Sequence, residues 1–197
     1  SAERSAHRKA APAFRQVLDR LEGYALYTGV TPNPPVAEAE AIAALYRAQQ
    51  CDSFVAVGGG SPMDAAKAAA ALLARPHRTL AQMAGLLKVR RPIPPFIAVP
   101  TTAGTAAEVT INYVITDVEK KRKFVCVDTN DIPEVAVVDP DMMSSMPKGL
   151  TAATGMDALT HAIEGYITKG HCTISDMFHL EAIKLISENL RGAVQNT

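Results

Sequence analysis

Asp157 and His161 have side chains that bind metal ions, and they stand four residues apart in the segment GMDALTHAIEG. The segment predicts a helix, in which residues four apart lie one turn apart on the same face. A carboxylate and an imidazole placed in this way can reach one cation. Two ligands are only half of a typical metal site, so the alternative is a hydrogen bond on a helix surface. His171 and His179 are less favoured as further ligands than as surface or partly packed histidines.

A second segment has the residues of a phosphate-binding turn between a predicted strand and a predicted helix. It consists of Gly58, Gly59, Gly60, Ser61 and Pro62. Glycines let the backbone turn sharply and let a diphosphate approach the N–H groups of a helix N-terminus, where the helix dipole favours negative charge. Asp64 is expected in the first helical turn, as a partner of the dipole or a hydrogen-bond acceptor. Neither the triphosphate-loop ending nor the third glycine of the usual dinucleotide fingerprint is present, so a ligand-free turn is the alternative.

A third segment offers hydroxyl groups after another predicted strand. Thr101, Thr102 and Thr105 surround the flexible Gly104. Because ligands bind at the carboxyl ends of parallel strands, two such loops on one sheet edge favour a shared ligand over two unrelated turns. The alternative for the threonines alone is a helix cap. Lys123 could reach a cofactor phosphate or ribose, although a solvated lysine is favoured when it is considered alone.

The elements that would position these groups alternate along the chain. Strands are predicted at Ala25–Val30, Ser53–Gly58, Phe96–Thr101, Val109–Thr116, Arg122–Asp128 and Val135–Asp139. Helices are predicted at Arg4–Leu21, Pro35–Gln50 and Pro62–Ala74, and after Pro147 at Thr151–Gly170 and Thr173–Asn196. The alternation predicts an α/β fold with parallel strands and right-handed crossovers. The polar link Asp117–Lys121 predicts an antiparallel hairpin appended to the sheet.

Composition excludes several classes of protein. Of the 197 residues, 48% are hydrophobic and 20% are charged, which is typical of a globular protein. Twenty basic residues balance twenty acidic ones, so we expect no partner among nucleic acids or anionic membranes. No apolar run approaches the ~20 residues of a membrane span. Cys51, Cys126 and Cys172 lack metal-ligand spacing, which favours free thiols in a reducing cytoplasm, with Cys126 buried.

Taken together, these segments resemble the iron-dependent (group III) alcohol dehydrogenases. The segments that carry the resemblance are Gly58–Lys67, Pro100–Thr110, Val138–Pro147 and Thr154–Gly165. The run Ala103–Asp128, followed by Asp131–Pro133, is most similar to the lactaldehyde-reducing branch of that family. The resemblance extends over roughly Tyr24–Val194, and Ala106-Ala107 departs from the Gly-Ser of many relatives, which removes one hydroxyl near the cofactor.

The resemblance implies a Rossmann-like dinucleotide-binding domain with a parallel sheet and an appended hairpin, at residues 1–147, whose first strand is missing. It implies the start of an all-helical metal-binding domain at residues 148–197. Asp157 and His161 match two metal ligands, and the two remaining histidine ligands of the family would lie beyond Thr197. The residues expected to contact the cofactor are Asn33, Gly58, Gly59, Gly60, Ser61, Asp64, Thr101, Thr102, Thr105 and Lys123. The implied cofactors are NAD and iron(II), with zinc(II) as the alternative metal.

We therefore expect a metal-dependent oxidoreductase that transfers a hydride between NAD(H) and a small alcohol or aldehyde. Lactaldehyde and 1,2-propanediol are the leading substrates, and a cytoplasmic homo-oligomer is expected. One alternative is a dinucleotide-binding module without catalysis. Another is a lyase related to dehydroquinate synthase, which would use the cofactor only transiently. A purely structural protein would leave the glycine and threonine loops unexplained.

Overall fold

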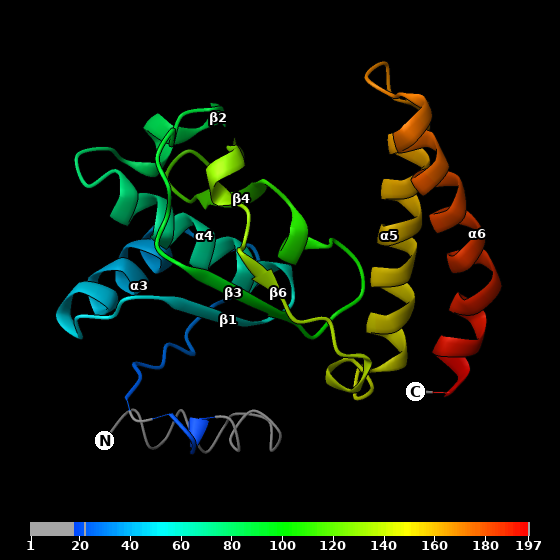
Figure 1. Ribbon diagram of the computed structural model, residues 1–197, viewed down its shortest axis with the longest axis horizontal. Helices are drawn as coiled ribbons and strands as arrows, with labels where there is room; N and C mark the ends of the chain where they lie inside the picture. Colours follow the sequence, from blue (N-terminus) through cyan, green and yellow to red (C-terminus); the bar gives the residue numbers. More distant parts are fainter. Residues whose placement is uncertain (1–17, 22, 197) are drawn as a thin grey trace.

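The computed structural model describes residues 18–21 and 23–196, and it contains an α/β part followed by a helical hairpin (Figure 1). The helices are α3 (Val36–Ala48), α4 (Gly60–Ala74), α5 (Lys148–Ile167) and α6 (Thr173–Asn196). The strands are β1 (Phe54–Gly58), β2 (Gly85–Leu86), β3 (Phe96–Pro100), β4 (Asn112–Asp117), β5 (Arg122–Val127) and β6 (Val135–Ala136). The predicted α/β class, with a parallel sheet and a helical C-terminal part, is confirmed.

The parallel sheet has the strand order β1-β3-β6, with Phe54 opposite Phe96 and Gly58 opposite Pro100. Phe54 and Phe96 are buried, and their rings stack with centroids 5.9 Å apart. The ring of Tyr46, from α3, stacks on Phe54 at 4.7 Å. Because β1 and β3 end in register, the loops that follow them emerge side by side at one edge of the sheet.

The predicted hairpin is real, but its placement was wrong. β4 and β5 pair antiparallel in a separate three-stranded sheet whose third strand is β2, and β2 was not predicted. Between the two sheets lies α4, whose alanine-rich sequence is buried at Ala65, Ala66 and four consecutive alanines, Ala68 to Ala71. Small side chains on all its faces allow this helix to pack against β1 and β4 at once.

Several predicted strand boundaries are corrected by the structure. Ala25–Val30 lies in no regular element, because it shares no ladder with any described strand. The strand predicted from Val109 begins at Asn112, after a short 3-10 turn, and the strand predicted at Val135–Asp139 is only Val135–Ala136. Of the helix predicted at Arg4–Leu21, residues 4–17 lie outside the described part of the chain.

The helices α5 and α6 form an antiparallel hairpin beside the α/β part (Figure 1). Glycines make the close packing possible: a Cβ on Gly155 would collide with Leu190, and one on Gly165 would collide with the ring of His179. Apolar side chains remain on the outside, with Ile167 70% and Phe178 72% exposed. The division into domains at residue 147 stays a prediction. Among the described residues, no helix is long and apolar enough to cross a membrane.

Candidate functional site: a glycine turn, a threonine loop and an exposed aspartate–histidine pair

The glycine turn connects β1 to α4 in a conformation that needs glycine. Gly58 has a φ of +147°, and a Cβ there would come within 2.6 Å of the ring of Pro62. Gly59 is the N-cap of α4, and no side chain caps the helix. The first backbone N–H groups of a helix have no partner within that helix. The turn therefore presents donors and the positive end of the helix dipole, a combination that suits a phosphate.

The threonine loop packs directly on the glycine turn. A Cβ on Gly59 would lie 3.0 Å from the hydroxyl of Thr102, and a Cβ on Gly60 would lie 3.2 Å from that of Thr105. The N–H of Thr101 donates to the carbonyl of Gly58 at 2.9 Å. The two loops therefore form one continuous surface, and a side chain at either glycine would require the facing threonine to shift.

Asn33, Ser61 and Lys123 are brought together on another side of the turn, although they come from three distant segments. Asn33 has a left-handed backbone with a φ of 58°. Its N–H donates to the Ser61 hydroxyl at 3.3 Å, and its side-chain oxygen accepts from Lys123 Nζ at 2.7 Å. The hydroxyl of Thr116 donates to its carbonyl at 2.9 Å. This network ties the hairpin to the glycine turn.

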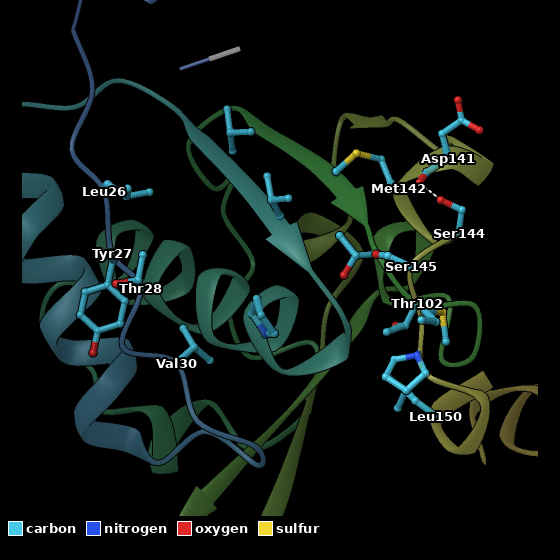
Figure 2. A pocket seen from close by; sticks show the side chains of 16 residues that line it. Leu26, Tyr27, Thr28, Val30, Thr102, Asp141, Met142, Ser144, Ser145 and Leu150 are labelled. Atoms are coloured by element: carbon cyan, nitrogen blue, oxygen red, sulfur yellow. Dashed lines mark hydrogen bonds between the residues drawn. The ribbon is translucent and has the colours of Figure 1, made fainter. Parts of the chain in front are cut away.

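A cavity of about 790 Å³ opens beside the carboxyl ends of β1 and β3. Figure 2 shows Tyr27 and Thr28 on one side of it, and Thr102 on the other side together with Met142 and Leu150. The segment around Met142 was noticed only as part of the family resemblance, and its position in a cavity wall was not predicted. The connection after β6 contains only a short 3-10 helix, Pro140–Met142, and has no hydrophobic periodicity. Only these three residues could have indicated its position from the sequence.

Asp64 was expected in the first turn of α4. It is instead the fifth residue of that helix. Its carboxylate accepts a hydrogen bond from the N–H of Val114 at 3.2 Å, so it fastens α4 to β4. Burial raises the pKa of Asp64 to about 6. This carboxyl is absent from the lining of the 790 Å³ cavity.

Lys67, one turn further along α4, is a fully buried cation that sequence reasoning missed. Its ammonium donates to the carbonyl of Thr110 at 2.6 Å, to the hydroxyl of the same residue at 3.2 Å and to the carbonyl of Asn112 at 3.3 Å. Burial lowers the pKa of Lys67 to about 8. Both oxygens of the buried Asp131 lack a hydrogen-bond partner among the described residues, and burial raises the pKa of Asp131 to about 7. The contacts of Lys67 tie α4 to the start of β4.

Asp157 and His161 lie on α5, and their side chains form a pair. His161 Nε2 and Asp157 Oδ2 are 3.6 Å apart, with the histidine 58% and the aspartate 45% exposed. No group of three or more metal-ligating residues exists among the described residues. His171 instead contacts Asp176 at 2.9 Å. The pair can supply two donor atoms to one ion, and further ligands are needed for a typical site.

The threonine loop also reaches the helix that carries this pair. A Cβ on Gly104 would lie 3.0 Å from Cβ of Thr154 and 3.2 Å from its carbonyl oxygen, so loop and helix are in close contact. Asp157 and His161 stand three and seven residues after Thr154, which places all three along one helical face. One loop therefore connects the glycine turn to the face of α5 that bears the aspartate and the histidine.

Comparison with models of protein families shows to which family the chain belongs. The model described as "Iron-containing alcohol dehydrogenase" matches residues 4–140, and the model of the C-terminal part of the same family matches residues 151–197. The chain belongs to the iron-containing alcohol dehydrogenases. Within this family, it is 49% identical over 184 residues to lactaldehyde reductase of Escherichia coli, covering 91% of the chain and 48% of that relative. It is 47% identical over 170 residues to 1,3-propanediol dehydrogenase of Klebsiella pneumoniae, covering 86% of the chain and 44% of that relative.

Solved structures of iron-containing alcohol dehydrogenases have the same fold. A 1,3-propanediol oxidoreductase matches with a TM-score of 0.89 and 43% identity, over 95% of this chain and 50% of that one. A sulfoacetaldehyde reductase from Bifidobacterium kashiwanohense, solved in complex with NAD+, matches with a TM-score of 0.83 and 39% identity, over 93% and 49%. The chain thus spans about half the length of the relatives it matches.

Proposed function

We propose that this chain holds NAD(H) and part of a catalytic metal site in an NAD-dependent alcohol dehydrogenase. The observation that carries the proposal is the position of the threonine loop. Its Thr102 lies against Gly59 of the glycine turn, and its Gly104 lies against Thr154 of α5. A cofactor on the turn and a metal ion on α5 would therefore be neighbours.

The cofactor would lie along the 790 Å³ cavity, whose lining includes Pro62, Thr101 and Thr102, with its diphosphate beside the cavity on the N-terminus of α4. Gly59 and Gly60 leave the helix N–H groups accessible, and the threonine hydroxyls beside them can donate to ligand oxygens. Lys123, already held by Asn33, adds a positive charge that can reach a phosphate or ribose. The binding of NAD+ by the sulfoacetaldehyde reductase, which has the same fold, supports this choice of cofactor.

Asp157 and His161 fit the chemistry of a metal site in part. A carboxylate oxygen and an imidazole nitrogen suit iron(II) and zinc(II), and their separation of 3.6 Å allows both to contact one ion. Their exposure leaves them free for that role, because neither side chain is used to hold the fold together. The family description favours iron. We propose that these two residues contribute half of the ligand set.

When bound, the nicotinamide would exchange a hydride with the substrate carbon while the metal ion would stabilise negative charge on the substrate oxygen. The residues of this chain would position the cofactor relative to the metal ion. The glycine turn fixes the diphosphate end of the cofactor, and Gly104 keeps the threonine loop against α5. Orientation of this kind lowers the entropic cost of bringing two reactive groups together.

We propose a small aldehyde or primary alcohol as substrate, with lactaldehyde and 1,2-propanediol first. The 49% identity to the Escherichia coli lactaldehyde reductase supports this choice. The test uses the longest reading frame that contains the chain, and follows loss of NADH absorbance with lactaldehyde, propanal and 3-hydroxypropanal. Turnover with none of the three would contradict the proposal, and a preference for 3-hydroxypropanal would reassign the substrate.

A dinucleotide-binding module without catalysis is the second candidate. The observation that favours it is that the described residues provide only two clustered metal-ligating groups. Calorimetric titration of the longest reading frame that contains the chain, first with NAD+ and then with iron(II) under anaerobic conditions, distinguishes the two. Binding of both ligands supports the dehydrogenase, whereas binding of NAD+ alone supports the module.

A further inference from the structure

The charges of this chain are segregated, although they cancel overall. No aspartate or glutamate occurs between Asp64 and Glu108. Within that stretch, the connection from α4 to β3 carries an unbalanced set of basic residues. They are Arg75, His77, Arg78, Lys88, Arg90 and Arg91. Among the described residues, no salt bridge joins these side chains to a carboxylate, although the buried Asp128 accepts from the backbone N–H of Arg90.

Four of these basic residues line a cavity of about 520 Å³ next to β2, and Arg75 and Arg91 lie outside its lining. Its lining is mostly cationic and polar: His77, Arg78, Gln82, Leu87, Lys88 and Arg90. Desolvation, together with repulsion from three neighbouring arginines, lowers the pKa of the Arg75 guanidinium. Positive groups crowded around a hollow whose lining contains no carboxylate favour an anion as its occupant.

The arginines are held in place by the backbone of the loop that they surround. Arg78 Nη1 donates to the carbonyl of Lys88 at 3.0 Å, and Arg90 Nε donates to that of Leu87 at 2.6 Å. Arg75 Nε donates to the carbonyl of Val89. A guanidinium has five N–H donors, so each arginine keeps others for a ligand. The buried Asp128 accepts from the backbone N–H of Arg90 at 2.9 Å and fixes the loop from below.

This cavity is separate from the cofactor cradle, the surface formed by the glycine turn (Gly58–Pro62) and the threonine loop (Thr101–Thr105). The glycine turn lies at the N-terminus of α4, and Arg75 is the C-cap of the same helix. With 15 residues, the helix is about 22 Å long. Arginine at a helix C-terminus is stabilised by the negative end of the dipole, so the helix itself helps to gather positive charge there.

We propose that the cavity between Arg78, Lys88 and Arg90 binds a compact polyanion through its phosphate groups. Planar guanidinium groups donate two hydrogen bonds to one phosphate, and several adjacent phosphates can satisfy several of them together. The ligand class is an oligophosphate chain, because a single phosphate engages only part of the cationic lining. The site lies outside the machinery assigned to NAD and the metal.

The test is calorimetric titration of the chain with inorganic tripolyphosphate, compared with orthophosphate. Arg78→Gln/Arg90→Gln should weaken tripolyphosphate binding by at least about tenfold. Lys88→Gln, whose side chain anchors no loop carbonyl in the hydrogen bonds described above, should weaken it about threefold even if the double variant folds poorly. Absence of tripolyphosphate binding by the unmodified chain would overturn the proposal.

The matched control is Lys121→Gln/Lys169→Gln, which removes the same net charge from exposed positions elsewhere. Its tripolyphosphate affinity should stay within about twofold of the unmodified chain. An equal loss in both double variants would show that only net charge matters, and would contradict a site. Gly59→Val separates the two anion sites: loss of tripolyphosphate binding in that variant would assign the ligand to the glycine turn instead.

Discussion

The cofactor cradle and the aspartate–histidine pair differ in how completely this chain builds them. In the cradle, a Cβ on Gly59 or Gly60 would press on Thr102 or Thr105, so turn and loop fit closely. By contrast, the side chain of His161 is 58% exposed and has Asp157 as its recorded partner. The proposed phosphate-binding surface is assembled within one α/β unit, whereas the proposed metal-binding surface consists of one face of one helix.

This difference follows from the chemistry of the two sites. Phosphate groups can be held by backbone N–H groups at one helix N-terminus, which a single strand-turn-helix unit supplies. A metal ion needs three or more side chains arranged around it, and these come from elements that are distant in sequence. The cradle should therefore be sensitive to small changes of shape, and the metal pair to changes of chemistry.

The sharpest test of the metal side is Asp157→Ala or His161→Ala in the longest reading frame that contains the chain. Each variant should lose metal and lower turnover by at least about a thousandfold. Because both side chains are exposed, thermal stability without metal should change by less than about 0.5 kcal/mol. His171→Ala is the control, and activity retained in either ligand variant would contradict the assignment.

The cradle is tested by Gly59→Val. A branched side chain would press on the Thr102 hydroxyl, already 3.0 Å from the position of a Cβ, and would cover the helix N–H groups. Affinity for NAD+ should fall about a hundredfold or more, measured by calorimetry. Gly192→Ala, where a Cβ would meet nothing within 4 Å, is the control and should bind normally. Equal affinities in both variants would remove the turn from the cofactor site.

Asp131 links the stability of the folded chain to pH. Its pKa is raised to about 7 in the folded chain, against 3.8 for an ordinary aspartate. Between these values the unfolded chain releases a proton that the folded chain keeps, so this group lowers stability as pH rises from 4 to 7. Asp131→Asn should therefore stabilise the chain by about 2 kcal/mol at pH 8 and by much less at pH 4.5. Denaturant unfolding at both pH values measures this, and an equal effect at both would refute the linkage.

The smallest expected effect concerns the contact between the threonine loop and α5, at Gly104 and Thr154. Gly104→Ala would place a methyl group 3.0 Å from Thr154 and push the threonine loop away from α5. We expect a loss of about 1 kcal/mol in the free energy of unfolding. Gly170→Ala, in open space, is the control. Thermal unfolding compares the two, and identical transitions would mean that the loop tolerates separation from the helix.

Local sequence patterns predicted the strands and the helix of the cradle well. They predicted less well which strands pair with one another. The apolar runs ending at Gly58 and Pro100 are strands as expected, because each is short, buried and bounded by turn residues. Ala25–Val30 has the same composition but no ladder, since pairing depends on a partner rather than on local sequence. The two-residue strand β2 is too short to leave a periodic signal.

For the site, glycine and threonine positions were predictable because their chemistry is local. Asn33 was named as a cofactor contact only through the family resemblance, and its contact with Ser61 was not predicted, since nothing in either segment indicates the other. Asp64 was misplaced because a carboxylate near a helix start also suits a backbone donor from a neighbouring strand. Lys67 was overlooked because a lysine in an alanine-rich helix usually indicates a solvent-facing position, and here it is buried.

The contact of Gly104 with Thr154 has a thermodynamic consequence, because the loop that touches α5 also touches the floor of the dinucleotide cradle. If capture of a cation tilts α5, the displacement is transmitted to Thr102, and the pocket for the diphosphate changes with it. Linkage then requires reciprocity: each ligand alters the affinity of the other by the same factor. Cooperativity between redox cofactor and cation would thus arise from a single loop held between two binding surfaces.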